Sequence, residues 1–429
     1  MIQVFEVIVV GAGPGGIAAA TIAAEAGQST CLLDDNAAPG GQIWRGFRPE
    51  TAQKYPHGRA FLHWMDRLTK TKCKVWPGWQ VIDQPSENVL RLEREGEFRD
   101  IAFRKLILAT GARERFLPFP GWTLPGVTGA GGLQALVKAG LDARGRRVVV
   151  AGTGPLLLAI AAGLRDAGAK IVAIHEQAPL SRLLAFGFVL AGYPGKLIEG
   201  ARYRQKLLGV PYRTSCWVKC AEGSARVERV TLTDGRKEWT LDCEWLACGF
   251  HLVPNLELPR LLGCRIANGY VSVDSSQQSS ASGIACIGEL TGIGGLEKAL
   301  LEGQIAGWAA AGRGKEAAAL ESPLKRMRAF AERLNRAFAL RDELRALPAM
   351  DTLVCRCEDV PHADTRECSS WREAKLHTRC GMGPCQGRIC GPATEFLYGW
   401  NCSGMRQPAF PANVSTVAAK VDSPEPIHL

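Results

Sequence analysis

The residues best suited to chemistry in this chain are the cysteines near its C-terminus. Two of them form the motif Cys355-x-Cys357, and the glycine-rich stretch RCGMGPCQGRIC supplies Cys380-x4-Cys385 and then Cys390. Four thiolates in two tight pairs are a ligand set for zinc or for an iron–sulfur cluster. Zinc sites more often use Cys-x2-Cys, and glycine-rich backbone can donate hydrogen bonds to cluster sulfurs, so the pattern favours [2Fe–2S]. The predicted ligands are Cys355, Cys357, Cys380 and Cys385.

Four positions around these thiols have more than one interpretation. Cys390 can replace Cys385 as a ligand, or it can be a core thiol at the start of a helix. Cys368 is interpreted as structural. Arg356 and Arg388 either lie in solvent or offset the negative charge of a cluster.

The remaining cysteines and the histidines exclude some chemistries. The chain has fifteen cysteines, an odd number, and we expect no secretory leader, which argues against a disulfide framework. No CxxC or CxxxxC pair occurs in residues 1–219, so the chain is not expected to be a disulfide reductase. The histidines show no metal-ligand spacing. We find no Arg–Tyr–Lys arrangement suited to an amino-acid carboxylate, and the catalytic residues stay unassigned.

A glycine loop near the N-terminus predicts a nucleotide site. The apolar run VFEVIVV leads into GAGPGG and an alanine-rich stretch, and a second apolar run ends at Asp34. In such a βαβ unit Gly11 permits the turn, Gly13 lets the backbone approach a pyrophosphate, and Gly16 allows close helix packing. The helix that begins around Pro14 supplies amide donors. Asp34 lies about 20 residues further on, where an acid receives the ribose hydroxyls.

Three further stretches resemble the glutathione-reductase-like flavoproteins, which have two dinucleotide-binding domains. They read KLILATGARER, GIACIGELTGIGG and PGGQIWR. The resemblance implies FAD at the first glycine loop. It also implies FAD contacts within these stretches, at Ala109, Thr110, Gly111, Gly288, Glu289, Gly41 and Gln42. The commoner family residue at position 289 is Asp, so the contact of Glu289 stays open.

A second strand, glycine loop and helix occur at RRVVVAGTGPLLLAIAAG. The loop contains Gly152 and Gly154, but Leu157 replaces the third glycine, which weakens a pyrophosphate cradle. Glu176 ends the next strand and would favour an unphosphorylated ribose. Two interpretations stay open: this domain binds an adenine nucleotide, or it is a scaffold that presents a protein interface.

Together the motifs predict an α/β fold, a two-dinucleotide-binding-domain flavoprotein with a small helical C-terminal domain. Flavoprotein motifs occur before and after the second glycine loop, so the second nucleotide domain is inserted into the first. The predicted parts are a discontinuous FAD-binding domain at 1–112 and 251–325, an inserted NAD-like domain at 113–250, a helical linker at 326–350, a [2Fe–2S] domain at 351–402, and an extended arm at 403–429 that lies on a partner or is disordered.

Composition limits the partners. The 429 residues carry a formal net charge of +10, but the basic residues are interleaved with acids, which argues against nucleic-acid binding. No apolar run approaches the roughly 20 residues of a membrane span. We expect a cytoplasmic protein without a transmembrane segment, and peripheral association with the inner membrane stays open.

The C-terminal motifs resemble the helical [2Fe–2S] domain of the bacterioferritin-associated ferredoxin type. From GAGPGG through AGTGPLLLA to RCGMGPCQGRICGP, the whole chain resembles the α subunits of heteromeric amino-acid dehydrogenases and oxidases. That family includes hydrogen cyanide synthase, octopine and nopaline oxidase, D-hydroxyproline dehydrogenase and dye-linked proline dehydrogenase.

The resemblance implies a catalytic β subunit whose own FAD oxidises an amino acid, an opine or a proline-like secondary amine, with a small third subunit in some complexes. This chain would relay the electrons through its flavin and [2Fe–2S], with FMN at the subunit interface in some relatives. Two alternatives are a self-sufficient NADH-dependent FAD/[2Fe–2S] reductase and a degenerate scaffold whose cysteines hold zinc.

Overall fold

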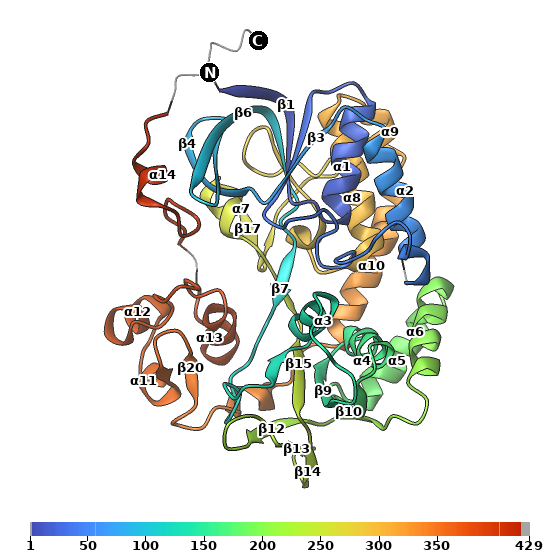
Figure 1. The fold of residues 1–429 in the computed structure, drawn as a ribbon, viewed down its shortest axis with the longest axis vertical. Helices are drawn as coiled ribbons and strands as arrows, with labels where there is room; N and C mark the ends of the chain where they lie inside the picture. Colours follow the sequence, from blue (N-terminus) through green and yellow to red (C-terminus); the bar gives the residue numbers. More distant parts are fainter. Residues whose placement is uncertain (1, 56, 403, 422–429) are drawn as a thin grey trace. The chain divides into compact units, whose positions relative to one another are not determined.

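The computed structural model describes residues 2–55, 57–402 and 404–421 and divides the chain into two compact units (Figure 1). The first unit takes Met1–Arg113, Pro254–Glu332 and Gly404–Leu429, and the second takes Glu114–Val253 and Arg333–Ser403. The chain crosses between units in strands β7 (Ala112–Glu114) and β16 (Leu252–Pro254), and the domain limits expected from the sequence stay a prediction. The finer division into a linker and a [2Fe–2S] domain stays a prediction.

The first unit is built on a mixed sheet. Its strands are β1 Gln3–Val10, β2 Thr30–Asp34, β3 Lys74–Pro77, β4 Gln80–Ser86, β5 Val89–Arg94, β6 Glu97–Leu108 and β19 Ile284–Cys286. The order is β3-β2-β1-β6-β5-β4, with β19 also paired to β6. The pairs of β1 with β2 and β6, of β2 with β3 and of β6 with β19 are parallel, while β4, β5 and β6 are antiparallel. Strand β1 is buried on both faces along its second half, which explains its continuous apolar run.

Three helices contribute to the core on one face of this sheet: α1 Pro14–Glu25, α2 Gly58–Thr69 and α8 Gly295–Ala310. Figure 1 shows α1 and α8 side by side. A Cβ atom on Gly303 would lie 2.2 Å from the carbonyl oxygen of Gly15, so these helices approach closely enough to require glycine.

A second core fills the other face of the sheet, around Phe5, Leu92 and Leu258. The shorter elements of this unit are η1 Ala52–Lys54, α7 Glu257–Leu261, β17 Ile266–Ala267, β18 Tyr270–Val271, η2 Gly288–Thr291, α9 Gly314–Ala318 and α14 Val414–Ala418. Helix α10, Glu321–Ala337, runs across the boundary between the units.

The described part of the C-terminal tail packs on the first unit's own sheet. Arg91 of β5 is buried in an ion pair with Asp100 at 2.8 Å, and it donates to the backbone oxygens of Thr416 and Ala419 at 2.9 and 2.8 Å. A buried guanidinium has five donors to satisfy, more than one carboxylate accepts. Part of the segment expected to be an arm at 403–429 therefore belongs to this fold, and its end lies outside the described residues.

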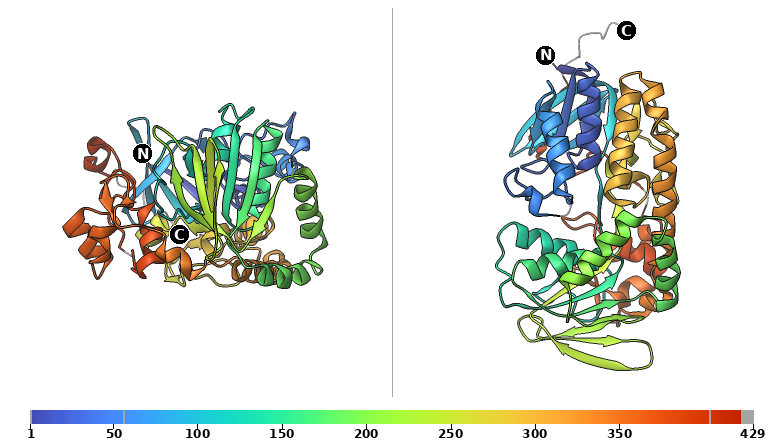
Figure 2. Two further views of the ribbon diagram at one scale, coloured as in Figure 1. Left: turned by 90° about the horizontal axis from the view of Figure 1, so that it is seen from below. Right: turned by 90° about the vertical axis from the view of Figure 1, so that its right-hand side faces the viewer.

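The second unit contains a parallel sheet, whose green strands lie beside green helices in Figure 2. The strand order is β11-β10-β9-β15-β8. The bounds are β8 Val127–Gly129, β9 Arg147–Thr153, β10 Lys170–Glu176, β11 Tyr212–Thr214 and β15 Trp245–Phe250, with helices α3 Ala130–Lys138, α4 Leu156–Asp166, α5 Leu180–Leu190 and α6 Pro194–Lys206. An antiparallel sheet of β12 Trp217–Glu222, β13 Arg229–Thr233 and β14 Glu238–Asp242 completes this part.

The second unit also contains the cysteine-rich segment. Its elements are η3 Asp342–Ala346, β20 Leu353–Cys355, β21 Val360–Pro361, α11 His362–Arg366, α12 Trp371–Thr378 and α13 Cys390–Tyr398. Three of the six buried residues in its small core are cysteines: Cys355, Cys380 and Cys390. No helix in the described ranges is both long and apolar enough to cross a membrane.

A buried charge network ties α8 to the loop before it. Glu302 is fully buried and accepts from Lys298 at 2.9 Å and from Arg328 at 2.8 Å. The Lys298 ammonium, also buried, donates to the backbone oxygen of Gly288 at 2.7 Å, and the Gly288 amide donates to Glu302 at 2.8 Å. The network therefore fixes a loop that the sequence predicts to touch the cofactor.

Replacing Glu302 by Leu should destabilise the protein by about 3–5 kcal/mol, because Lys298 would be left buried without its carboxylate. The double variant Lys298→Met/Glu302→Leu should lose less stability than Glu302→Leu alone. Urea unfolding measures both. Glu316→Ala removes a half-exposed ion pair and serves as the control, for which we expect little change. An unfolding midpoint for Glu302→Leu that matches this control would contradict the prediction.

Candidate functional site

Five cysteine thiols converge in the C-terminal segment of the second unit. The sulfur atoms of Cys355, Cys380 and Cys390 lie within 4.8 Å of one another, and all three residues are buried. Hydrogen bonds link Cys390 to Cys385 and Cys385 to Cys357. The structure thus brings the four predicted ligands together, and it places Cys390, which the sequence left open, at the centre.

The electrostatics of the thiols suit a thiolate site. Hydrogen bonds from the thiols of Cys380 and Cys390 hold the pKa of Cys355 well below its usual range. A hydrogen bond from Cys390 likewise lowers the pKa of Cys385 to about 5. The sulfur atoms of Cys355, Cys380 and Cys385 surround the single S–H of Cys390 as possible acceptors, and this raises the pKa of Cys390. Thiolates are the metal-binding form of cysteine, so two of the predicted ligands are already favoured in that form.

Glycines shape the loop that carries three of these thiols. A Cβ atom on Gly383 would lie 2.4 Å from the Cβ atom of Cys357. Gly381 and Gly387 have positive φ angles of 79° and 78°, and both face the ring of Trp371. The Gly381 amide donates to the Cys355 sulfur at 3.5 Å. The glycine-rich loop therefore lies close to the first thiol pair, as a hydrogen-bonded cluster site requires.

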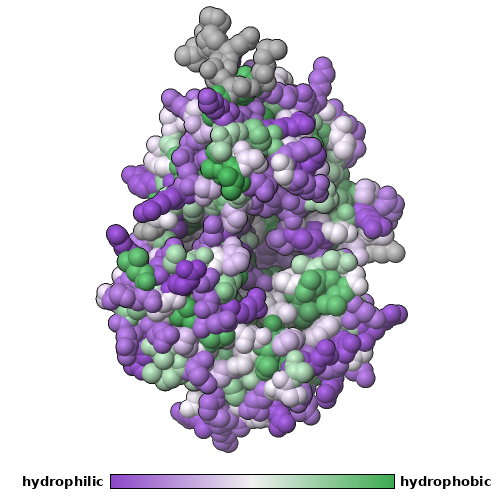
Figure 3. Space-filling model, turned by 60° about the vertical axis from the view of Figure 1, so that its left-hand side comes forward, coloured by the Kyte–Doolittle hydropathy of each residue, from purple (hydrophilic) through white to green (hydrophobic). Residues whose placement is uncertain are grey.

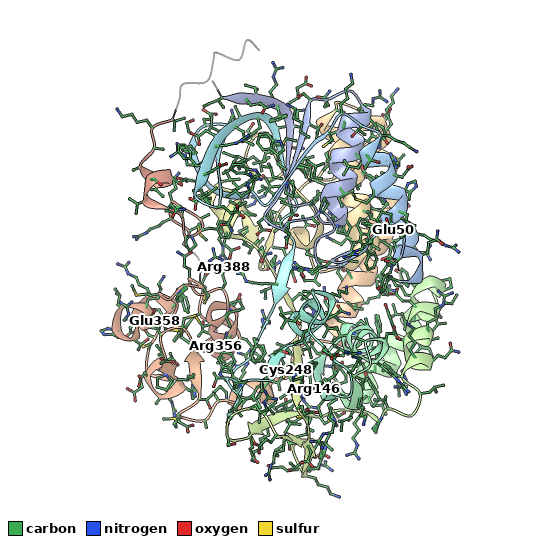
Figure 4. All side chains as sticks on the ribbon, viewed as in Figure 1. Glu50, Arg146, Cys248, Arg356, Glu358 and Arg388 are labelled. Carbon is green, nitrogen blue, oxygen red and sulfur yellow. The ribbon has the colours of Figure 1, made fainter. Side chains whose placement is uncertain are left out.

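Two arginines, Arg356 and Arg388, lie in the cysteine-rich segment, where Figure 4 labels them together with Glu358. The guanidinium of Arg356 lies 5.6 Å from the ring centroid of Trp122, and that of Arg388 donates to the backbone oxygen of Cys385 at 3.3 Å. Arg379 forms an ion pair with Glu358 at 2.7 Å. Arg388 is thus held on the backbone of a thiol-bearing residue, and whether it offsets negative charge there stays a prediction.

The first glycine loop lies at the N-terminus of α1 and has the geometry of a phosphate-binding turn. A Cβ atom on Gly11 would lie 2.3 Å from the oxygen of Ala109, and one on Gly16 would lie 1.8 Å from the oxygen of Gly11. At Gly13, by contrast, a Cβ atom would meet nothing within 4 Å. Pro14 begins the helix. The open space at Gly13, beside the amides of a helix N-terminus, fits a pyrophosphate.

The loop containing Gly41 lies against this turn. Gly41 has a φ angle of 56°, and a Cβ atom there would lie 2.8 Å from the Cα atom of Gly13. The Gly40 amide donates to the oxygen of Ala12 at 2.7 Å. Gln42 is exposed. The structure therefore brings two of the predicted FAD-binding stretches into direct contact.

Asp34 supports the first glycine loop as well as ending β2. Its carboxylate accepts from the Ala12 amide at 2.5 Å and from the backbone and side-chain nitrogens of Asn36 at 2.7 Å each. These contacts fix the turn next to Gly13. The predicted contact of Asp34 with a ribose stays a prediction.

Asn255, which the sequence analysis missed, anchors the stretch from Ala109 to Gly111. Its side chain donates to the oxygen of Thr110 at 2.8 Å, and its backbone oxygen accepts from the Thr110 hydroxyl at 3.0 Å. Its amide donates to the oxygen of Gly111 at 3.0 Å. No local pattern marks Asn255, because its partners lie more than a hundred positions away in the chain.

Glu289 caps the start of α8. Its two carboxylate oxygens accept from the amides of Gly294 and Gly295 at 2.8 and 2.9 Å. Burial raises its pKa, although Lys298 and these amides act in the opposite direction. The residue therefore orders the loop that begins at Gly288, and its contact with a cofactor stays a prediction.

The second glycine loop, like the first, is held by an acid at the end of the next strand, and here the acid is more deeply buried. Glu176 is fully buried and accepts from the amides of Gly154 at 2.7 Å and Ala178 at 2.8 Å. A Cβ atom on Gly154 would meet nothing within 4 Å, while Leu157 is buried against Gly249. Asp34 has similar backbone donors, but Glu176 is completely buried, which leaves this loop less suited to a ribose than the first.

Comparison with known proteins identifies the family. Residues 5–313 match the family model of the pyridine nucleotide-disulphide oxidoreductases. The chain is 30% identical to the HcnB subunit of hydrogen cyanide synthase from Pseudomonas aeruginosa, over 94% of this chain and 96% of that protein. It is 33% identical to an opine oxidase subunit of Rhizobium meliloti, over 91% of each. The chain belongs to the pyridine nucleotide-disulphide oxidoreductase family, together with these subunits. The family predicted from the motifs and the predicted fold class are both confirmed.

Solved structures agree with the fold of this oxidoreductase. L-proline dehydrogenase from P. horikoshii aligns with 98% of this chain and 81% of its own, at a TM-score of 0.67 and 19% identity. Thioredoxin reductase from T. acidophilum aligns with 72% of this chain and 98% of its own, at a TM-score of 0.56. A small thiol-bearing segment follows the part of the oxidoreductase that matches the family model. The chain is therefore a flavin-dependent oxidoreductase.

Gly383→Ala should weaken the thiol site of the oxidoreductase without removing a thiol. The new methyl group would overlap Cys357, and overpacking of this kind typically costs about 1–3 kcal/mol. We expect a lower thermal midpoint and less bound metal per chain, measured by elemental analysis of the purified protein. Gly314→Ala is the control, since a Cβ atom there meets nothing within 4 Å. Equal metal content in the two variants would refute the steric argument.

Glu176 should make the stability of the oxidoreductase depend on pH. Burial raises the pKa of Glu176 from 4.5 to about 7 and outweighs its amide hydrogen bonds, which lower it. The folded state then holds a proton that the unfolded state has lost. The resulting stabilisation is present below pH 4.5 and disappears as pH rises to about 7.

Glu176→Gln cannot titrate, so wild type should lose on the order of 1–3 kcal/mol relative to this variant across that pH interval. Thermal melts of both proteins at a series of pH values measure the difference. Glu316→Gln, in an exposed ion pair, should follow the wild-type pH profile. Parallel profiles for wild type and Glu176→Gln would show that Glu176 does not titrate there.

Proposed function

We propose that this chain is the electron-transferring subunit of a heteromeric flavin-dependent dehydrogenase or oxidase that acts on the C–N bond of an amino acid or secondary amine. The observation that carries the proposal is the convergence of five thiols in a segment joined to a flavoprotein fold. The names of the relatives, subunits of hydrogen cyanide synthase and opine oxidase, support a heteromer. The substrate would be an opine, D-hydroxyproline or a proline-like amine, bound by a partner subunit with its own FAD.

The thiol site fits a [2Fe–2S] cluster in ligand type and number. Such a cluster takes four thiolates, and the convergent group of thiols offers five. We assign Cys355 and Cys357 as the ligands of one loop and Cys380 and Cys385 as the ligands of the other, with Cys390 in place of Cys385 as the alternative. The site draws only on cysteines, because the candidate metal group found in the described residues contains no carboxylate or imidazole.

The nucleotide site fits FAD in the first unit. Gly11 and Gly16 allow the turn, Gly13 leaves room for the pyrophosphate, and the N-terminus of α1 supplies amide donors. Asp34 and Glu289 hold the two loops that border the site. When bound, the flavin and the cluster supply the redox chemistry. The chain's own residues bind and orient them, and in this proposal FMN would lie at the interface with the partner.

A self-sufficient NADH-dependent reductase is the second candidate. The second glycine loop and the similarity to rhodocoxin reductase of Rhodococcus erythropolis, 28% identical over 66% of this chain, favour it. Glu176 opposes it, because its carboxylate is completely buried and therefore closed to a ligand. Rapid loss of flavin absorbance when NADH is added to the isolated chain would select this candidate. No reaction with NADH, with flavin reduction only in the presence of a partner and its amine substrate, would select the first.

The first experiment is a spectrum of the anaerobically purified chain, with assays of iron, acid-labile sulfide, zinc and released flavin on the same sample. We expect flavin together with two irons and two sulfides per chain, the content of a [2Fe–2S] cluster. One zinc and no iron would overturn the electron-transfer proposal and leave a structural site.

Single Cys→Ser variants then assign the ligands. Cys355→Ser and Cys357→Ser should each lose iron and sulfide while keeping flavin. Of the Ser variants at Cys380, Cys385 and Cys390, two should lose the cluster and one should retain it. Cys368→Ser, at a thiol outside the group, is the control and should keep full iron content. Retention of iron by Cys355→Ser would contradict the assignment.

A further inference from the structure

Helix α5 is an apolar helix that the fold of its own unit scarcely buries. Its sequence, LSRLLAFGFVL, contains one charged residue, and Phe186 is its only buried residue. The ring of Phe186 packs edge-on against that of Phe338, with centroids 5.7 Å apart. None of the residues of the next helix, α6, is buried. Apolar helices in globular proteins normally bury one face, so this pair is built for contact with something else.

The exposed side chains of α5 form a stripe. Leu180, Leu184 and Phe188 are spaced four residues apart and therefore lie on one face of the helix. Their exposed fractions are 53%, 60% and 84%. Leu197 and Ile198 at the start of α6 add 50% and 52%. Exposed apolar residues also occur elsewhere, and the face in Figure 3 shows green areas interrupted by purple ones. What sets the α5 stripe apart is that its large side chains are aligned along one helix.

The same segment is basic. Residues 180–208 contain five basic residues and one acid, which gives a net charge of +4. The basic residues are Arg182, Lys196, Arg202, Arg204 and Lys206. The single acid, Glu199, lies 3.3 Å from the ammonium of Lys196. Four of the five basic residues belong to α6, and one of these, Lys206, forms an ion pair with Asp166 of α4 at 2.6 Å. The positive charge that follows the apolar stripe therefore lies mainly on Arg202 and Arg204.

We propose that α5 and α6 form a docking surface for an anionic lipid bilayer. Helices that lie in a membrane interface combine a stripe of Leu and Phe with Lys and Arg that reach the headgroups. At 11 residues, α5 is too short to span a bilayer. It would lie in the interface with Leu184 and Phe188 among the acyl chains and the basic residues of α6 at the phosphates.

The polarity of α5 favours lipid over a protein partner. Protein interfaces carry about one hydrogen bond per 100–200 Å². Among the exposed side chains of α5, only Ser181 and Arg182 can form one. A bilayer interior requires no such partners, whereas anionic headgroups reward the positive charge of α6. The proposal uses only residues of the second unit, and it does not depend on the thiol site.

The test is flotation of the purified full chain with vesicles of phosphatidylcholine plus phosphatidylglycerol, and with vesicles of phosphatidylcholine alone. Wild type should bind the anionic vesicles, and added salt should weaken the binding. Phe188→Ser and Leu184→Ser should each lower the partition coefficient about tenfold or more, since each removes a large apolar side chain from the bilayer. Arg202→Gln/Arg204→Gln should weaken binding to the anionic vesicles selectively.

Leu376→Ser is the matched control, because Leu376 is 71% exposed but lies on α12. It should bind as wild type does. Circular dichroism confirms that the variants are folded, and flavin content checks the first unit independently. Failure of wild type to bind anionic vesicles, or equal binding by Phe188→Ser, would overturn the proposal. Sedimentation provides a further check. If wild type self-associates and Phe188→Ser is a monomer, the proposal is overturned and the stripe binds a second copy of the chain.

Discussion

Close approach of backbone to backbone at the start of α1 is the constraint on which the first unit depends. Gly11 touches the carbonyl of Ala109, Gly16 touches that of Gly11, and Gly303 brings α8 against Gly15. A side chain at any of these positions would separate strands and helices that the rest of the unit is built around. The same approach leaves an open space at Gly13, so one packing requirement produces both the core and the nucleotide site.

Both units use an acid at the end of a second strand to hold a glycine loop. Asp34 accepts from the amide of Ala12, and Glu176 accepts from that of Gly154. Glu176 is longer and completely buried, which raises its pKa and turns it inward to structural contacts. The glycine loop and its supporting acid thus have the same geometry in the second unit, but Glu176 is less accessible to a ligand than Asp34.

The sequence predicts the features that depend on local chemistry. Glycine loops, the apolar strands around them and the cysteine spacing are each readable within a few residues, and the family confirmed by the comparisons follows from those motifs. The features it does not predict join distant residues. Asn255 anchors Thr110, Arg328 reaches Glu302, and Cys390 lies among three other thiols. Hydrogen bonds of this kind depend on how elements pack, and no periodicity or motif marks them.

The buried guanidinium of Arg91 depends on acceptors that are synthesised much later than Arg91 itself. Two of the oxygens that Arg91 requires belong to Thr416 and Ala419, the first of them 325 residues later in the sequence. At 5–20 residues per second the ribosome takes roughly 15–65 s to make that stretch. During this interval the Arg91 guanidinium of the first unit lacks two of its acceptors. Most of the second unit is synthesised before those acceptors are. The surface of β4 and β5 on which the tail packs would therefore stay uncovered for most of the synthesis of the chain.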